Sequence, residues 1–237
     1  MPDRIVISHT ENSEKLSDTL VDDLLSALPF AQLHHIRRFK RYQDRQASLL
    51  ARLLIFHHFL QRENAENGVR DLLFFNANGR PCLQLPAVDC SISHSNESVV
   101  TCIGYGYTVG IDIEKIKTTN FQGMASSVPA LYTFVRDCTS GEEQFFNAWT
   151  MLESLLKAEG SGFTSDFSIR SLSGNRYSAG SSTWTIEKIT IRPDYACHLA
   201  YSAPEKTIPV VEKTCIGLQE LIEAGRQLKS DACRPPP

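Results

Sequence analysis

A long amphipathic helix followed by a group of short strands is the sequence feature that most limits the possible folds. The helix is predicted over residues 41–63, where Leu49, Leu53, Phe56 and Leu60 recur every three or four residues. After it come the runs RDLLFF, CSISHS, SVVTCIGYG and TVGIDIEKI, which are separated by Asn, Gly and Ser. Such β-branched or alternating runs are typical of antiparallel strands. We therefore expect a helix packed on a sheet in the first half of the chain.

The same order returns in the second half. A helix is predicted from Ser140, which with Glu143 makes a capping-box pattern, to Glu159, where Gly160 ends it. The runs FSIRSL, STWTIEKITI and YACHLAYSA then predict strands, and GLQELIEAGRQLK predicts a last helix. A helix followed by strands thus occurs twice.

This repeated order predicts an α+β fold with two similar subdomains in a pseudo-two-fold arrangement. The expected boundaries are residues 1–106 for the N-terminal half and residues 107–229 for the C-terminal half, which would contain the metal site. Residues 230–237 are expected to be a disordered tail, because the prolines that end the chain can neither continue a helix nor pair as a strand.

Composition excludes several classes of partner. The chain of 237 residues is 42% hydrophobic and has a formal net charge of −3, so it has no general attraction to nucleic acid or to anionic membranes. No window is apolar enough to cross a bilayer. The seven cysteines form no C-x-x-C pair, which favours reduced thiols and a cytoplasmic location. We expect neither nucleic acid nor a membrane as a partner.

Two acidic side chains share one face of a predicted strand. In GIDIE, Asp112 and Glu114 project together while Ile111 and Ile113 point into the core. Neighbouring carboxylates repel each other unless a cation lies between them, and ligand sets made of oxygen alone favour a hard ion such as magnesium. A strand with its polar face in water is the alternative, and the short motif does not decide between them.

Glu153 and Lys157 lie four residues apart on the second predicted helix and therefore on one face of it. On an ordinary surface such a pair would be a solvent-exposed ion pair. Here apolar neighbours leave only a narrow polar stripe, and they are Phe145, Ala148, Trp149, Met151, Leu152, Leu155 and Leu156. The charged pair is therefore expected to face either a crevice or a partner.

Three further stretches contain residues that could bind an anion. SISHS places Ser93 beside His94, but neighbours in a strand point to opposite faces, which disfavours a serine hydrolase. His94 is either a phosphate contact or a hydrogen-bonded structural histidine. The basic run RRFKRYQDRQ, which includes Arg38 and Arg45, is either a solvated face or a local anion site. The turn NGRP presents Arg80.

The order of these motifs resembles that of the 4'-phosphopantetheinyl transferases of the larger, surfactin-synthetase-activating type. Over residues 37–163, GRP, SISHS, GIDIE and WTMLESLLKAEGSGF resemble the family signatures G-K-P, S-H-S, G-I-D-I-E and W-[ST]-x-K-E-[AS]-x-x-K-x-x-G-x-G. The last signature matches at Trp149, Thr150, Glu153, Ser154, Lys157, Gly160 and Gly162. The resemblance implies two similar α+β halves with coenzyme A in the cleft between them. It also implies a monomer, because one chain makes the whole cleft.

The resemblance further implies a reaction and the residues that perform it. The 4'-phosphopantetheine of coenzyme A would be transferred to a serine of an apo acyl or peptidyl carrier protein, with release of adenosine 3',5'-bisphosphate. Asp112, Glu114 and Glu153 would hold Mg²⁺. Glu153 would also take the proton from the serine, and Lys157 would stabilise charge on the leaving phosphate. The coenzyme A-binding residues so implied are Arg38, Arg45, Ser48, Arg80, Pro81, Ser93, His94, Asp112 and Lys157.

Departures from the family pattern leave alternatives open. Leu152 and Arg80 both stand where the family has a lysine, so a cationic contact is expected to be missing at Leu152, whereas Arg80 keeps the charge. Residues 117–140 lack the aromatic and glutamate pattern that follows G-I-D-I-E in the family, which leaves the choice of carrier open. The alternatives are a non-catalytic protein that binds coenzyme A or a carrier, and a magnesium-dependent phosphohydrolase that acts on a nucleotide.

Overall fold

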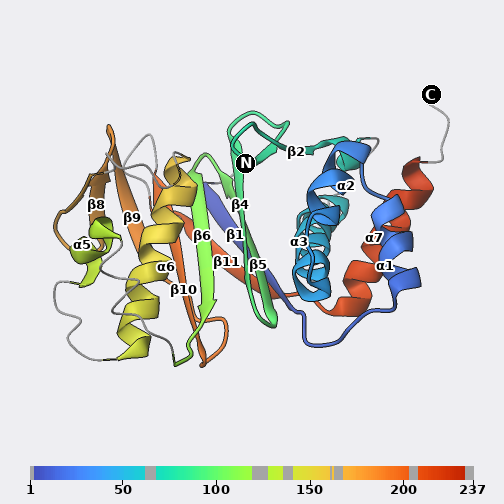
Figure 1. Cartoon of the computed structure of the whole chain (residues 1–237). Helices are drawn as coiled ribbons and strands as arrows, with labels where there is room; N and C mark the ends of the chain where they lie inside the picture. The colour runs from blue at the N-terminus through green and yellow to red at the C-terminus, as the bar shows by residue number, and fades with distance from the viewer. Residues whose placement is uncertain are drawn as a thin grey trace.

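The computed structural model describes residues 3–61, 68–118, 128–135, 141–160, 162, 168–202 and 208–232. A group of helices lies on one side of the molecule, followed by a first sheet and then by a second sheet that carries one long helix on its face (Figure 1). The predicted α+β class is confirmed. Within the residues described, no helix is both long and apolar enough to span a membrane.

The first sheet has four strands in the order β11-β1-β5-β4. These strands span Val210–Cys215, Arg4–Glu11, Ser98–Tyr105 and Val88–Ser95. β1 is parallel to β11 and antiparallel to β5, so segments from both ends of the chain meet in one sheet. The helices on its outer side are α1 (Asp18–Ser26), α2 (Phe30–Arg37), α3 (Tyr42–Leu60) and α7 (Leu218–Ala232) (Figure 1).

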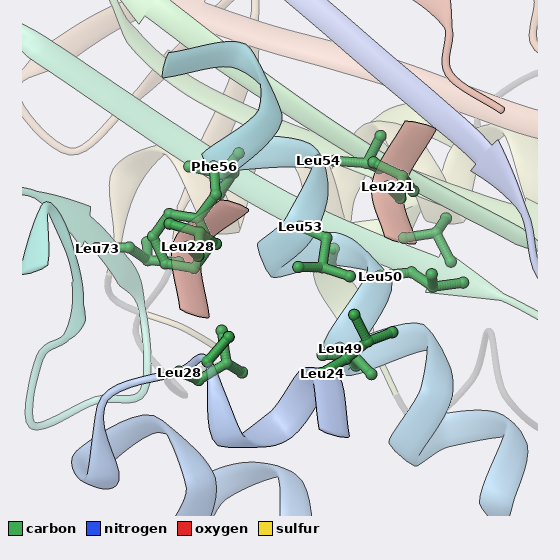
Figure 2. Packing of buried hydrophobic residues seen from close by; sticks show 14 of the residues in the cluster. Leu24, Leu28, Leu49, Leu50, Leu53, Leu54, Phe56, Leu73, Leu221 and Leu228 are labelled. Atoms are coloured by element: carbon green, nitrogen blue, oxygen red, sulfur yellow. The ribbon is translucent and has the colours of Figure 1, made fainter. Parts of the chain in front are cut away.

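These helices and the first sheet share one hydrophobic core with α3 at its centre. Leu49, Leu50 and Leu53 of α3 are inaccessible to solvent. Figure 2 shows them in one cluster with Leu24 of α1 and Leu221 of α7. Full burial of each such side chain contributes about 1.5–3 kcal/mol. Packing against α3 therefore holds α7 on the N-terminal half, although α7 is the last helix.

The second sheet has five strands in the order β6-β10-β9-β8-β7. They span Thr108–Lys115, Tyr195–Ser202, Ser182–Lys188, Arg176–Ala179 and Ile169–Ser171. Helix α6 (Glu142–Glu159) covers this sheet (Figure 1). It approaches β6 closely because Gly110 has no side chain: a Cβ there would lie 2.1 Å from the carbonyl oxygen of Ser154. Gly110 thus sets the distance between the helix and the strand.

The inner faces of the two sheets form a second core between the halves. The aliphatic and thiol side chains that meet there include Ile5, Ile7, Val100 and Cys102 from the first sheet and Ile111, Ile113, Cys197 and Leu199 from the second. All of them are inaccessible to solvent. Their burial fixes the two sheets to each other and makes the wall between them rigid.

Short elements complete the chain. The 3₁₀ turn η1 (Val69–Asp71) and the two-stranded sheet of β2 (Leu73–Phe75) and β3 (Pro81–Leu83) connect α3 to β4. The turn η2 (Pro129–Leu131) and helix α5 (Tyr132–Val135) precede α6. Residues 119–127 and 136–140, which carry most of the segment that departs from the family pattern, lie outside the described residues.

The two longest predicted helices are confirmed as α3 and α6. α6 ends at Glu159 as expected, and Gly160 after it adopts a left-handed conformation with φ 85°. The predicted start is wrong, because Gly141 and not Ser140 is the N-cap, and it makes no side-chain hydrogen bond. Ser140 itself lies outside the described residues.

Several elements have no counterpart in the sequence prediction: β1, α1, α2 and β11. Although β11 and α7 fall within the predicted C-terminal half, 107–229, they pair with β1 and pack on the first core. α7 also continues through residues 230–232, which the sequence assigned to the tail, and residues 233–237 lie outside the described part. The division of the chain after residue 106 stays a prediction.

Candidate active site

Alternate side chains of β4 hydrogen-bond to the backbone of β6, although the two strands belong to different sheets. β6 is an edge strand, so its outer N–H groups have no neighbouring strand to bond. The side chains of Asp89, Ser91, Ser93 and Ser95 accept hydrogen bonds from the N–H groups of Val109, Ile111, Ile113 and Lys115, at 2.9, 3.1, 3.4 and 3.1 Å. This ladder sets the register of β4 against β6.

Two serines of this ladder also hold the acidic side chains of β6. Ser93 Oγ donates to Asp112 Oδ1 and Ser95 Oγ donates to Glu114 Oε2, both at 2.7 Å. Each hydroxyl therefore accepts from the backbone and donates to a carboxylate. The alternation that placed these serines in SISHS is explained by strand contacts, with no need for a nucleophile.

Lys157 of α6 reaches across to the same carboxylate. Its Nζ lies 2.7 Å from Asp112 Oδ1 and 2.9 Å from Ser93 Oγ. Asp112 is 4% exposed, so the ammonium group compensates a charge that has little access to water. The sequence left open whether Glu153 and Lys157 form a solvent-exposed ion pair or face a crevice or a partner. The contacts of Lys157 favour a crevice.

A cleft of about 420 Å³ runs between the walls formed by α3 and α6. Eight of the predicted site residues line it: Ser48, Pro81, Ser93, His94, Asp112, Glu114, Glu153 and Lys157. Arg80 lines a neighbouring cavity of about 450 Å³, which shares Pro81, Glu153 and Lys157 with the first. The structure thus brings together residues that are more than 100 positions apart in the sequence.

Arg38 and Arg45 line neither of these two cavities. Arg45 instead lies 3.4 Å from Asp18 in an exposed ion pair. Arg80 is bound by Asp89, whose Oδ2 accepts from Arg80 Nη2 at 2.6 Å. For Arg45 the exposed ion pair favours the solvated face that was the alternative for the basic run, and the role of Arg38 stays a prediction.

Asp112, Glu114 and Glu153 form the acidic wall of the cleft, and burial raises the pKa of two of these carboxyl groups. The pKa of Glu153 is raised to about 7, chiefly by burial and then by the negative charge of Asp112, while Lys157 acts in the opposite direction. Burial also raises the pKa of Glu114, against the hydrogen bond from Ser95. A carboxyl group that titrates near neutral pH is suited to accept and release a proton.

Burial lowers the pKa of His94, so the imidazole is neutral at physiological pH. His94 packs edge to face against Phe39, with ring centroids 6.4 Å apart. Its ring nitrogens make no hydrogen bond to a described residue, although His94 lines the cleft. This favours a ligand contact over a structural histidine.

The acidic wall has features that suit a divalent cation. Oδ2 of Asp112 is buried and has no hydrogen-bond partner among the described residues, so a cation would satisfy it. Asp112, Glu114 and Glu153 offer only oxygen ligands, which Mg²⁺ prefers. In the described chain, however, no group of three or more His, Cys, Asp or Glu side chains is arranged to hold a metal.

Leu152 does not belong to this site. It is inaccessible to solvent and packs in a core cluster with Phe145, Ala148, Leu156 and Ala196. It lines neither cavity. α6 thus turns Leu152 toward the core and Glu153 toward the cleft, and the loss of a cationic contact relative to the family pattern stays a prediction.

Other residues of the cleft were missed by sequence reasoning, among them His35, Phe75 and Arg52. His35 and Phe75 come from α2 and β2, which carry no recognisable motif. Arg52 lies within the apolar run of α3, four residues after Ser48. A charged residue inside a buried helical face was the one available signal.

Comparison with known proteins gives a family match. Residues 108–206 match the model of the 4'-phosphopantetheinyl transferase superfamily. The chain is 29% identical over 142 residues to the 4'-phosphopantetheinyl transferase Sfp of Bacillus subtilis (strain 168), an alignment that covers 56% of this chain and 62% of Sfp. It is 33% identical over 129 residues to the 4'-phosphopantetheinyl transferase gsp of Aneurinibacillus migulanus, covering 53% of each. The matches thus span only 53–62% of the length of these two relatives.

Proposed function

We propose that this chain, whose residues 108–206 belong to the 4'-phosphopantetheinyl transferase superfamily, transfers the 4'-phosphopantetheine of coenzyme A to a serine of an apo acyl or peptidyl carrier protein. The second product is adenosine 3',5'-bisphosphate. The observation that carries the proposal is one cleft that contains Asp112, Glu114, Glu153 and Lys157 together with Ser93 and His94. We expect the reaction to take place in the cytoplasm and the enzyme to be a monomer.

Asp112, Glu114 and Glu153 are the residues that would hold Mg²⁺. When bound there, the ion supplies positive charge to the pyrophosphate and polarises the phosphorus that is attacked. The remaining chemistry falls to the protein itself. Ser93 and Ser95 fix two of the three carboxylates through the hydrogen bonds at 2.7 Å.

Glu153 serves as the general base in this proposal. The carrier serine Oγ forms a bond to the phosphorus next to the pantetheine, the bond from that phosphorus to the bridging oxygen breaks, and the serine proton passes to Glu153. In the metal-free protein burial raises the pKa of Glu153 to about 7, so this carboxylate is a stronger base than an ordinary one. Lys157 compensates the negative charge that develops on the departing adenosine 3',5'-bisphosphate.

The opposite wall binds the nucleotide. His94 and Ser48 line the cleft on the side of α3, and Arg80 and Pro81 line the neighbouring cavity. Neutral His94 can donate one hydrogen bond to a phosphate oxygen. Nucleotide and pantetheine arm would thus lie across the boundary between the two halves.

The test is direct transfer. The protein is incubated with Mg²⁺, coenzyme A and a panel of apo acyl and peptidyl carrier proteins, and the carriers are weighed by mass spectrometry. We expect one carrier class to gain the mass of the phosphopantetheine arm, and EDTA to prevent the gain. Binding of coenzyme A with no transfer to any carrier would instead support a non-catalytic binding protein. Hydrolysis of coenzyme A without a carrier would support the phosphohydrolase.

A further inference from the structure

A buried polar contact joins helix α6 to the sheet that it covers. Oγ1 of Thr150 on α6 lies 2.7 Å from Nδ1 of His198 on β10. Thr150 is inaccessible to solvent and His198 is 5% exposed. The core clusters on this side of the sheet are apolar and include Leu152, Leu155 and Ala196. Burying a histidine among such side chains costs free energy unless the ring is hydrogen-bonded, so the contact is a specific polar link between helix and sheet.

The hydrogen bond between Thr150 and His198 has a defined direction. Oγ1 of Thr150 lies 2.8 Å from the carbonyl oxygen of Phe146 and 3.1 Å from that of Asn147. Carbonyl oxygens only accept, so the single hydroxyl proton is used there and Oγ1 accepts from His198. Burial, and then the charge of Lys188, lowers the pKa of His198 to about 4. The imidazole is therefore neutral and carries its proton on Nδ1.

This link lies close to two residues of the acidic wall. On β10, His198 is the cross-strand partner of Asp112 on β6, and partners in an antiparallel pair project from the same face of a sheet. On α6, Thr150 precedes Glu153 by three residues, which is less than one turn. The hydrogen bond thus connects the strand pair that contains Asp112 to the helical turn that contains Glu153.

Two contacts of different kinds hold α6 on either side of Glu153. At Gly110 the helix packs on the strand backbone, where a Cβ would lie 2.1 Å from the carbonyl oxygen of Ser154 and 2.4 Å from the backbone nitrogen of Ala158. Such packing sets the distance between helix and strand, but it is not directional. The hydrogen bond at Thr150 is directional, so it fixes the rotation of α6 about its own axis.

We propose that His198 is a positioning residue: through its hydrogen bond to Thr150 it holds α6 in the rotation that places Glu153 in the cleft with Asp112. This inference rests on the proposed function, since it takes Glu153 as the base. His198 itself lines neither cavity of the site, whereas Glu153 and Asp112 line the cleft. Loss of the hydrogen bond should therefore change the rate of transfer and not the affinity for coenzyme A.

Two amide side chains at position 198 test this role. The amide nitrogen of Asn takes the place of Nδ1 of histidine, whereas that of Gln takes the place of Nε2. His198→Asn should keep the bond to Thr150 and retain kcat within about threefold, although the smaller side chain leaves a cavity and lowers stability. His198→Gln is closer to histidine in volume but lacks the bond, so kcat should fall about 10- to 100-fold. The dissociation constant for coenzyme A, measured by calorimetry, should change less than about threefold in both variants.

A purely structural role of His198 predicts a different pattern. In that case kcat would follow the free energy of unfolding, measured by urea denaturation, and His198→Asn would lose at least as much activity as His198→Gln. Equal values of kcat in the two variants would also overturn the inference. If neither variant folds, Thr150→Ser and Thr150→Val give the same comparison from the side of α6. The serine keeps the hydroxyl and should retain kcat, whereas the valine removes it and should lose kcat.

The matched control is His58→Asn. The pKa of His58 is also lowered to about 4, chiefly by burial, and its Nε2 lies 2.8 Å from Oη of Tyr105, but it lines neither cavity. This variant removes the atom that bonds Tyr105, so it should lose stability and keep kcat. Transfer by the wild type with an unchanged kcat in His198→Gln would reject the inference alone. No transfer by the wild type to any carrier would reject the proposed function and the inference with it.

Discussion

Helices α3 and α6 have almost the same length, 19 and 18 residues, and they form opposite walls of the same cleft. They place charge there in different ways. α3 is buried along most of its length and presents Arg52, whose charge no described acidic group compensates. α6 buries one face against β6 and β10 and presents Glu153 and Lys157, whose charges interact with Asp112.

This difference separates binding from chemistry. A buried cation fixed by its own helix has one arrangement, which suits recognition of a group that does not react. Carboxylates and an ammonium group in mutual contact can exchange partners and protons when a metal or substrate arrives. We therefore expect substitutions on the α3 wall to change affinity and substitutions on the α6 wall to change the rate.

The largest expected effect comes from removing the base. Glu153→Gln should lower kcat for carrier modification by about 10²- to 10⁴-fold, because the serine proton loses its acceptor. Affinity for coenzyme A in calorimetry should fall much less. The control is Glu143→Gln, since Glu143 lies on the same helix but pairs with Lys188 at 3.8 Å outside the cleft. If Glu153→Gln weakened binding and left kcat intact, the assignment of chemistry to α6 would be lost.

A second prediction concerns the two faces of α6. Leu152→Lys restores the residue type of the family pattern, yet Leu152 is inaccessible to solvent in the core. Burying an ammonium group there should reduce the free energy of unfolding by about 2–4 kcal/mol, measured by urea denaturation. Leu152→Met, which keeps volume and polarity, should change it by less than about 1.5 kcal/mol. A stable Leu152→Lys protein with tighter coenzyme A binding would mean that this position does face the cleft.

Leu152 also illustrates which parts of the site a sequence can predict. Motifs with a fixed spacing on one element identified Asp112, Glu114, Glu153 and Lys157, because helix and strand periodicity place such residues on one face. Periodicity alone could not say that Leu152 turns inward, since the helix has apolar residues on several sides. The family pattern could not say either that this position lies in the core of this chain.

Cleft residues that belong to no motif of fixed spacing could not be predicted in this way. Arg52 and Phe75 reach the cleft only because α3, β2 and β4 come together, and that packing depends on long-range contacts. For the same reason β11 was not predicted: it is an exposed edge strand whose partner, β1, lies some 200 residues earlier. Its pairing is set by tertiary structure and not by a local pattern.

The smallest effect we predict separates the two walls by pH. In metal-free buffer with EDTA, the pKa of Glu153 is raised from its ordinary value of 4.5 to about 7 by burial and by Asp112. The folded state therefore binds this proton more tightly than the unfolded state. The stabilisation is fully present below pH 4.5 and is lost as the pH rises through about 7.

Wild-type protein should thus lose roughly 1–2 kcal/mol of stability relative to Glu153→Gln between pH 5 and pH 8, after allowance for solvent screening. Differential scanning calorimetry of both proteins across this range gives the difference directly. Because only the difference is used, the other raised carboxyl groups, Glu114 and Asp89, largely cancel. Arg52→Lys should leave the pH slope unchanged, since both side chains stay charged throughout. If the stabilities of wild type and Glu153→Gln changed in parallel with pH, the pKa of Glu153 would not be raised in the folded protein.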